Sequence, residues 1–234
     1  DIVAVSPGVA RAAIARRFAD EAECARRASA PVVFVDKDGT LIEDLPYNVE
    51  PRRIRFAPGA REAIRRLGEA GYRLVVVTNQ SGVARGYYDA VGLGRVAEHL
   101  AAEFRALGAT LDGFYACPHL PDGINEWAIE CDCRKPEPGM VHRATRDLRL
   151  RRDGAWFVGD TWMDVMAGRA AGCRTILVGP DRVDVPDWPT ERRPDHAVRD
   201  LLDAAEIILA ADSADDSAPV RTSRRPSRVP AAVR

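Results

Sequence analysis

Short apolar runs alternate with longer amphipathic stretches through the middle of the chain. The runs contain almost no polar residues, which is typical of strands buried on both faces of a sheet. The longer stretches repeat apolar residues every three or four positions, which predicts amphipathic helices. The expected strands are residues 32–35, 74–77, 111–116, 155–158 and 175–178, and the expected helices are residues 60–70, 93–107, 138–147, 163–171 and 199–210.

This alternation predicts an α/β fold, a doubly wound Rossmann-like parallel sheet with helices on both faces. Ligands of such sheets bind beyond the carboxyl ends of the strands. We expect one main domain at residues 31–210. Residues 1–30, rich in Ala and Arg, form an N-terminal extension that we expect to be helical. Residues 211–234 are poor in large apolar side chains, which predicts a disordered tail.

Composition narrows the kinds of partner. The 234 residues include 34 basic and 35 acidic side chains, a formal net charge of −1. No overall field would therefore attract nucleic acid or an anionic membrane. No apolar run approaches the roughly 18 residues that a membrane span needs, and residues 1–27 lack the pattern of a signal peptide. We expect a cytoplasmic monomer that acts on a small molecule.

Two carboxylates follow the first expected strand directly, in the sequence Asp36-Lys37-Asp38-Gly39-Thr40. In an extended stretch, side chains two residues apart point the same way. One carboxylate could attack phosphorus while the other handles the leaving-group proton. The alternative for this motif alone is an Asp-Gly turn with solvated acids.

Polar residues also follow later strands. Residues 78–82 (TNQSG) offer a hydroxyl, amides and a glycine suited to phosphate oxygens, although such residues often only cap a helix. Lys135 could neutralise a phosphate, although most lysines lie on the surface. Asp160 and Asp164 follow another strand and, with Asp36, could hold Mg²⁺. The alternative for these two acids is a solvated loop pair.

Three cysteines and a histidine gather within seventeen residues. Cys117, His119, Cys131 and Cys133 form the ligand set of a closed tetrahedral zinc site, which would be structural because four protein ligands leave no open position. The alternative is a reduced, metal-free set of cysteines. Because Cys133 directly precedes Arg134 and Lys135, zinc would also fix the lysine. Cys24 and Cys173 are interpreted as ordinary thiols.

The order DxDGT, strand-end Thr, Lys and GDxxxD, over about residues 31–210, resembles the haloacid dehalogenase superfamily of phosphatases. The resemblance implies that Asp36 is the nucleophile and Asp38 the general acid and base. It implies that Thr78 and Lys135 stabilise the phosphoryl group. It places Mg²⁺ on Asp36, the Asp38 carbonyl and Asp160, with Asp164 supporting the site. The spacing between motifs leaves no room for the large cap domain of many members.

Within the superfamily, residues 78–86 (TNQSGVARG), 117–119 (CPH) and 131–140 (CDCRKPEPGM) resemble heptose-bisphosphate phosphatases, which share this layout with histidinol-phosphate phosphatases. The resemblance implies that Arg134 meets the second phosphate of a sugar bisphosphate, a task that suits a guanidinium. The other expected substrate contacts are Asp44, Leu45, Pro46, Tyr47, Asn79, Gln80, Ser81 and Thr161. Thr161 departs from the basic residue common there, and residues 44–48 (DLPYN) depart from a Gly-Tyr form.

Three functions therefore stay open after the sequence is read. The first is hydrolysis of the 7-phosphate of a heptose 1,7-bisphosphate, and the second is hydrolysis of histidinol phosphate or another small sugar phosphate. The third is a non-catalytic, zinc-stabilised binding module.

Overall fold

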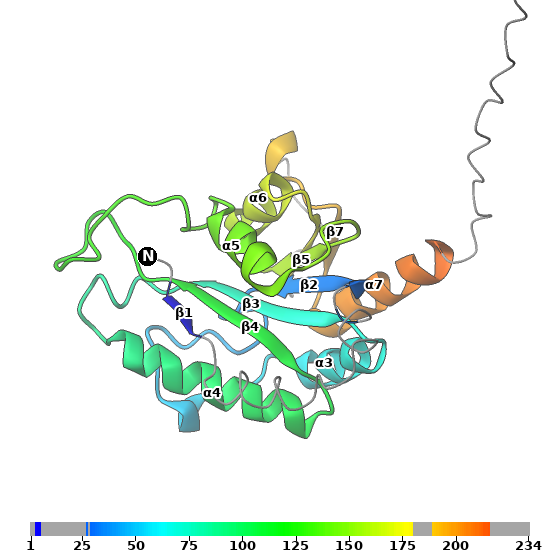
Figure 1. Ribbon diagram of the computed structural model, residues 1–234, viewed down its shortest axis with the longest axis horizontal. Helices are drawn as coiled ribbons and strands as arrows, with labels where there is room; N and C mark the ends of the chain where they lie inside the picture. Colours follow the sequence, from blue (N-terminus) through cyan, green and yellow to red (C-terminus); the bar gives the residue numbers. More distant parts are fainter. Residues whose placement is uncertain (1–2, 6–26, 28, 180–188, 216–234) are drawn as a thin grey trace, which may run out of the picture.

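A single sheet runs through the computed structural model, which describes residues 3–5, 27, 29–179 and 189–215 (Figure 1). In this part of the chain the sheet has seven strands in the order β1-β4-β3-β2-β5-β6-β7. All neighbours pair in parallel except β1, which lies antiparallel to β4. The strands are β1 (Val3–Val5), β2 (Val32–Val35), β3 (Arg73–Asn79), β4 (Leu111–Cys117), β5 (Trp156–Gly159), β6 (Arg174–Val178) and β7 (His196–Val198).

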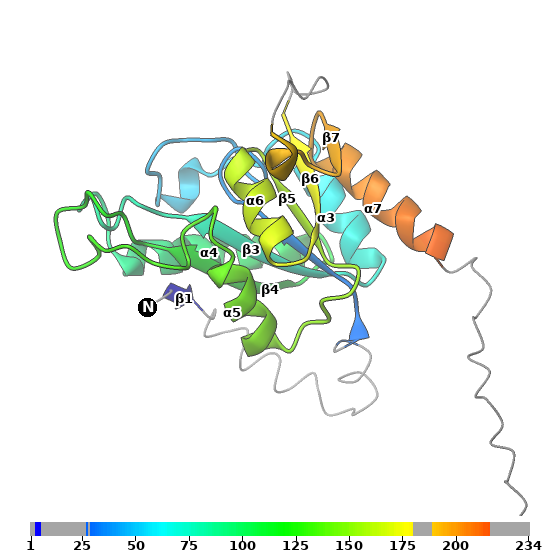
Figure 2. The ribbon, with the colours of Figure 1, turned by 90° about the horizontal axis from the view of Figure 1, so that it is seen from above.

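Helices cover both faces of this sheet. They are α3 (Ala60–Glu69), α4 (Ala90–Ala106), α5 (Gly139–Leu148), α6 (Trp162–Ala170) and α7 (Leu201–Asp215), with 3-10 turns η1 (Pro51–Arg53) and η2 (Thr190–Arg192). One apolar core joins the sheet to α3, α4 and α7, and a second joins it to α5 and α6. Figure 2 shows α5 and α6 in front of the sheet and α4 behind it. The predicted α/β fold with a parallel sheet is confirmed.

Strand β2 explains why the strands read as unbroken apolar runs. Val33 and Val35 point into the core that holds α3, α4 and α7, while Val32 and Phe34 point into the core that holds α5 and α6. Successive side chains of a strand face opposite sides, so a strand covered on both faces needs apolar residues at every position. All four side chains are buried.

The order of the strands creates a crevice at the end of β2. The chain moves outward from β2 through β3 to β4, and then returns to β5 on the other side of β2. Ligands of doubly wound sheets bind where the direction of winding reverses in this way. The fold therefore directs attention to the residues that follow β2 and β5.

Two terminal segments differ from the expectation. At Val3–Val5 the chain is extended and not helical, with Val3 opposite Ala116 and Val5 opposite Phe114 on β4. Local composition favoured a helix, but the unpaired edge of β4 offers these residues backbone hydrogen bonds that composition does not reveal. At the other end, α7 continues to Asp215, so residues 211–215 are helical where a disordered tail was expected. Of the other residues in these two segments, the structure describes only 27, 29 and 30, and residues 27 and 29 are helical.

The two connections that could carry an inserted domain, between β2 and β3 and between β3 and α5, contain few helices and strands. Residues 36–72 contain η1 and α3, and residues 80–138 contain α4, β4 and an irregular loop. Among the residues that the structure describes, none of the helices has the length and apolar character of a membrane span.

Candidate active site

The polar residues that follow β2, β3 and β5 converge at one edge of the sheet. Strand β2 pairs with both β3 and β5, and the Asp36 N–H donates to the Val158 carbonyl over 2.9 Å. Gly39 follows with a φ of 80°. A Cβ atom at Gly39 would lie 2.4 Å from the Asp160 carboxylate. Glycine is needed here because the turn after β2 passes directly against Asp160.

A buried lysine joins the acids of this edge. The Lys135 ammonium group lies 2.5 Å from Asp36 Oδ1 and 2.6 Å from Asp164 Oδ1, and it donates to the Val77 carbonyl over 3.0 Å. Burial acts to lower the pKa of Lys135, but the carboxylates of Asp164 and Asp36 raise it above its usual value. The side chain therefore stays an ammonium ion that faces two acids.

The acids outnumber this one cation. Oxygens of Asp36, Asp160 and Asp164 all lie within 4.8 Å of one another. Burial raises the pKa of Asp36 well above its usual value; Lys135 opposes this shift, and the charges of Asp164 and Asp38 add to it. Asp36 and Asp164 are buried and Asp160 is half-buried, so three carboxylates gather around one ammonium group. A group of carboxylate oxygens such as this suits a divalent cation of the magnesium type.

Asp164 is held from the start of α6. Its Oδ2 atom accepts from the Thr161 backbone N–H over 3.0 Å and from the Thr161 hydroxyl over 2.5 Å. Its other oxygen faces Lys135. Thr161, expected to contact substrate, thus uses its hydroxyl to cap α6 and orient Asp164.

Asp38 lies at the more open side of the site, with 29% of its side chain exposed. Its Oδ1 accepts from the Lys37 ammonium over 2.7 Å, and its Oδ2 accepts from Gln80 Nε2 over 2.8 Å. Gln80 Nε2 also lies 2.9 Å from Thr78 Oγ1. The structure thus brings the two expected catalytic acids, the threonine and the lysine to one place.

The amides of Asn79 and Gln80 were expected to contact substrate, but protein groups engage both. Asn79 Oδ1 accepts from the Lys135 N–H over 3.0 Å, and Asn79 Nδ2 donates to the Lys135 carbonyl over 3.1 Å. Asn79 therefore fixes the backbone that carries the buried ammonium group. Gln80 is buried and accepts from the Tyr88 hydroxyl over 2.6 Å. Motif spacing could not reveal these contacts, because they join side chains from separate loops.

The four predicted zinc ligands also meet. Cys117, His119, Cys131 and Cys133 have neighbouring ligand atoms 3.2–3.6 Å apart, with His119 Nδ1 directed at the sulfurs. These separations exclude a disulfide, whose sulfurs lie about 2.05 Å apart. Ligands about 2.0–2.3 Å from a tetrahedral zinc ion would lie about 3.3–3.8 Å from one another. The spacing of the cluster therefore fits a zinc ion without rearrangement.

A cleft of about 320 Å³ lies beside this loop and reaches Lys135, the partner of Asp36 and Asp164. Its walls combine Arg134, Lys135 and Pro136 with Met163 of α6 and a set of loop residues, Pro121, Ile129, Glu130 and Cys131. Arg134 donates to the His119 carbonyl over 3.3 Å, so the cysteine loop holds it at the cleft. The volume suits a small ligand such as a phosphorylated sugar. Met163 and Ile129 were not predicted from the sequence. The only signal for them was their position close to Asp160 and Cys131 in the chain.

The other expected substrate residues lie apart from this cleft. Asp44, Pro46 and Tyr47 are exposed, Leu45 and Ser81 are half-buried, and none of them is among the described residues that line it. The Tyr47 ring meets Tyr87 edge to face at 4.7 Å between centroids. This contact joins the 44–47 loop to the loop before α4.

Comparisons with known proteins agree with this geometry. A family model described as HAD-hydrolase-like matches residues 132–204. The D-glycero-beta-D-manno-heptose-1,7-bisphosphate 7-phosphatase of Pasteurella multocida is 36% identical over 177 residues, which cover 75% of this chain and 95% of that protein. The protein of the same name from Yersinia pestis is 40% identical over 151 residues, covering 64% and 80%.

Among solved structures, the D,D-heptose 1,7-bisphosphate phosphatase of B. bronchiseptica, complexed with magnesium and phosphate, aligns with a TM-score of 0.66. It is 32% identical, and the alignment covers 77% of this chain and 99% of that chain. A putative HAD-like phosphatase from Mesorhizobium loti gives the same TM-score and identity, with 77% and 88% covered.

Proposed function

The chain belongs to the haloacid dehalogenase-like phosphatases, and we propose that it hydrolyses the 7-phosphate of D-glycero-D-manno-heptose 1,7-bisphosphate through an aspartyl phosphate on Asp36. The observation that carries the reaction is the ion-paired group Asp36, Lys135 and Asp164 at the end of the central strand, with Asp38 two residues away toward the opening. The names of the relatives support the substrate.

In the first step, the Asp36 carboxylate attacks phosphorus and the bond from phosphorus to the sugar oxygen breaks. Asp38 gives its proton to that oxygen, because an alkoxide is a poor leaving group. The Lys135 ammonium group and the Thr78 hydroxyl stabilise charge on the phosphoryl oxygens. In the second step, Asp38 takes a proton from a water molecule, and the water oxygen attacks phosphorus. The bond between phosphorus and the Asp36 oxygen breaks, which releases inorganic phosphate and restores the Asp36 carboxylate.

The carboxylates of Asp36 and Asp160, with the Asp38 backbone carbonyl, would hold Mg²⁺, and Asp164 would support the site through its contacts with Thr161 and Lys135. The three carboxylates whose oxygens lie within 4.8 Å of one another favour such a cation. Once bound, Mg²⁺ would neutralise part of the charge on the transferring phosphoryl group.

The cleft beside Lys135 supports the choice of a bisphosphate. Arg134 lines this cleft, and its guanidinium can bind the second phosphate in bidentate fashion. The cluster of Cys117, His119, Cys131 and Cys133 would hold a structural Zn²⁺ and keep Arg134 and Lys135 in place. The short connections between motifs leave the site without a large cap, so short loops select the substrate.

Steady-state kinetics on three compounds test the proposal, namely the α and β anomers of heptose 1,7-bisphosphate and histidinol phosphate. We expect kcat/KM for a heptose bisphosphate to exceed that for histidinol phosphate by at least about 100-fold, since only the bisphosphate offers Arg134 a second phosphate. A preference for histidinol phosphate would overturn the substrate and leave the reaction standing. The absence of phosphate release from all three compounds and from simple aryl phosphates would overturn the reaction.

A further inference from the structure

Both carboxylate oxygens of Asp38 are held by buried donors. Lys37 and Gln80, which donate to Oδ1 and Oδ2, are only 2% and 4% exposed. Asp38 itself is 29% exposed at its side chain. Asp38 is therefore partly exposed, but the two side chains that donate to it are buried.

The contacts of Gln80 fix which way its amide points. A carboxylate only accepts hydrogen bonds, so the NH₂ group of Gln80 must face Asp38. The same NH₂ group meets Thr78 Oγ1 at 2.9 Å, and its second hydrogen serves that contact. Thr78 then accepts from Gln80, which leaves its own hydroxyl hydrogen free to donate to a phosphoryl oxygen. One amide thus orients both the acid and the threonine.

Tyr88 keeps the amide in this orientation. Its hydroxyl donates to Gln80 Oε1 over 2.6 Å. Burial raises the pKa of Tyr88, and the Asp38 charge raises it further, so the hydroxyl keeps the proton that it donates. The ring lies against Gly82, where an added Cβ atom would come within 2.2 Å of a ring carbon. The loop after β3 is thus shaped around this tyrosine.

The lysine content of the chain also draws attention to Lys37. The sequence contains only two lysines, Lys37 and Lys135, and all its other basic residues are arginines. Both lysines are buried in this one site, and each is paired with one of the acids Asp36 and Asp38. Solubility or surface charge does not account for either of them.

Resting on the phosphatase function proposed above, we propose that Gln80, backed by Tyr88, and Lys37 are positioning residues that hold the Asp38 carboxyl group at the leaving-group oxygen. Their importance then depends on how much the leaving group needs a proton. A sugar alkoxide needs the proton of Asp38 as its bond to phosphorus breaks, whereas a 4-nitrophenolate ion leaves without one. Disturbing the position of Asp38 should therefore slow cleavage of alkyl esters more than cleavage of aryl esters.

The test compares kcat/KM for phosphate monoesters of graded leaving-group acidity, from the heptose bisphosphate to 4-nitrophenyl phosphate. This parameter covers the steps up to loss of the leaving group and omits hydrolysis of the aspartyl phosphate. For Tyr88→Phe we expect a fall of about tenfold with the sugar and of less than about twofold with the aryl ester. For Gln80→Met the expected falls are about 100-fold and a few-fold.

Tyr72→Phe is the matched control. Tyr72 directly precedes the start of strand β3, whereas Gln80 follows its end. The Tyr72 hydroxyl lies 3.4 Å from the carbonyl of Ile208 on α7. This variant should leave the ratio of sugar to aryl kcat/KM unchanged. Gly82→Ala, which displaces the Tyr88 ring without removing a polar group, should lower the ratio as Tyr88→Phe does. Thermal melts of all variants show whether each is folded. If Gln80→Met does not fold, the result for Tyr88→Phe alone decides the test.

The same kinetic measurements distinguish a failure of this inference from a failure of the proposed function. If the wild type cleaves the esters but Tyr88→Phe and Gly82→Ala lower all of them equally, or change none, the positioning role is wrong and the phosphatase remains. If the wild type cleaves none of the esters, the proposed function fails and the positioning role fails with it.

Discussion

Two clusters of ligand side chains stand side by side in this chain and differ in almost every property. The acid cluster of Asp36, Asp160 and Asp164 offers hard oxygen ligands, shares one ammonium ion and adjoins a cleft. The thiol cluster of Cys117, His119, Cys131 and Cys133 offers three sulfurs and one nitrogen and is largely buried. The first gathers anionic oxygen ligands around one ammonium group, and the second forms a closed set of four.

This difference is the one expected between a catalytic site and a structural metal site. Charged groups beside a cleft can act on a ligand, whereas a closed tetrahedral set has no position left for one. The two clusters are nevertheless joined through the backbone, because Cys133 is followed by Arg134 and Lys135. The contrast therefore predicts that changes in the acid cluster abolish chemistry, while changes in the thiol cluster weaken it.

The largest effect is expected from Asp36→Asn. Removing the proposed nucleophile should lower kcat by about 10⁴-fold or more, because we expect no other carboxylate to take its place in attack on phosphorus. Stability should fall less than in the Lys135 variant described next, since Lys135 keeps Asp164 as a partner. The measurements are phosphate release and the melting temperature, with the exposed Asp153→Asn as a matched control. Activity near that of the wild type would remove the acid cluster from the chemistry.

The next effect is expected from Lys135→Met, which leaves Asp36 and Asp164 facing each other without their cation. Breaking a buried ion pair from one side costs about 3–5 kcal/mol, so urea unfolding at pH 7 should show a loss of that order. Burial raises the pKa of Asp36 and Lys135 lowers it, so the variant raises this pKa further. The folded variant then takes up protons as the pH falls, and the loss should shrink toward pH 5. If the loss of unfolding free energy became larger as the pH fell, Lys135 would not lower the pKa of Asp36 as stated here.

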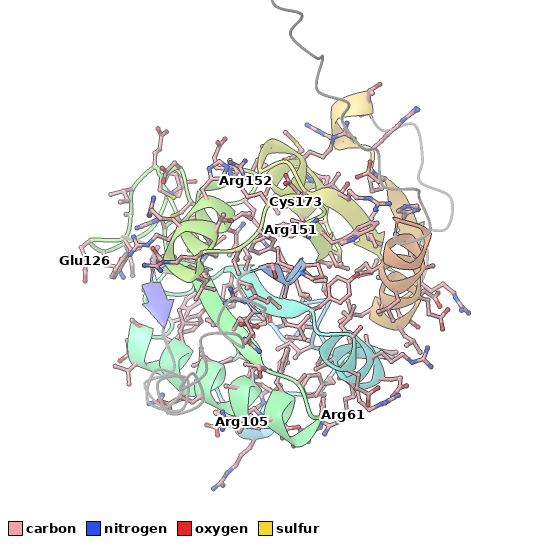
Figure 3. The ribbon with its side chains drawn as sticks, turned by 45° about the vertical axis from the view of Figure 1, so that its right-hand side comes forward. Arg61, Arg105, Glu126, Arg151, Arg152 and Cys173 are labelled. Carbon is pink, nitrogen blue, oxygen red and sulfur yellow. The ribbon has the colours of Figure 1, made fainter. Side chains whose placement is uncertain are left out.

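A smaller effect on catalysis is expected from Cys131→Ser, which opens the thiol cluster. If the cluster holds zinc as proposed, the variant should bind less of it and melt at a lower temperature, and kcat/KM should fall by about 10–100-fold because Arg134 and Lys135 shift. Cys173→Ser is the matched control. Cys173 lies near Arg152 and away from Glu126, which marks the loop between Cys117 and Cys131 (Figure 3). Unchanged kinetics in protein shown to be free of zinc would separate the two clusters completely.

The sequence reveals the members of the two clusters better than it reveals the contacts around them. All seven side chains could be named in advance as candidate ligands, because each follows a strand or lies in a short motif. The parallel sheet brings strand ends together, so Asp36 and Asp160 had to meet. The sequence could not show that Thr161 orients Asp164, or that Asn79 and Gln80 turn toward Lys135 and Asp38. Their donor and acceptor groups suit phosphate equally well, and only the packed loops decide between the two uses.

The fold shows the same limit at its edges. The buried strands were predictable because apolar runs on both faces leave little choice of structure. Strand β1 was not, because Val3–Val5 becomes a strand only by pairing with β4, more than a hundred residues away. The contacts that escape sequence reasoning are therefore those between distant segments of weak local preference.

The smallest effect is expected from an acid outside both clusters. Glu62 on α3 accepts hydrogen bonds from Arg65 and Arg66, which lower its pKa from 4.5 to about 2, yet it lies at the surface. A carboxylate whose pKa falls on folding adds stability above its unfolded pKa and loses it as the pH falls from about 4.5 toward about 2. Solvent screens an exposed pair, so Glu62→Gln should lower the melting temperature only slightly at pH 7 and still less at pH 3. A loss as large as that of Lys135→Met would mean that the number of partners, and not burial, decides what a charged group contributes in this protein.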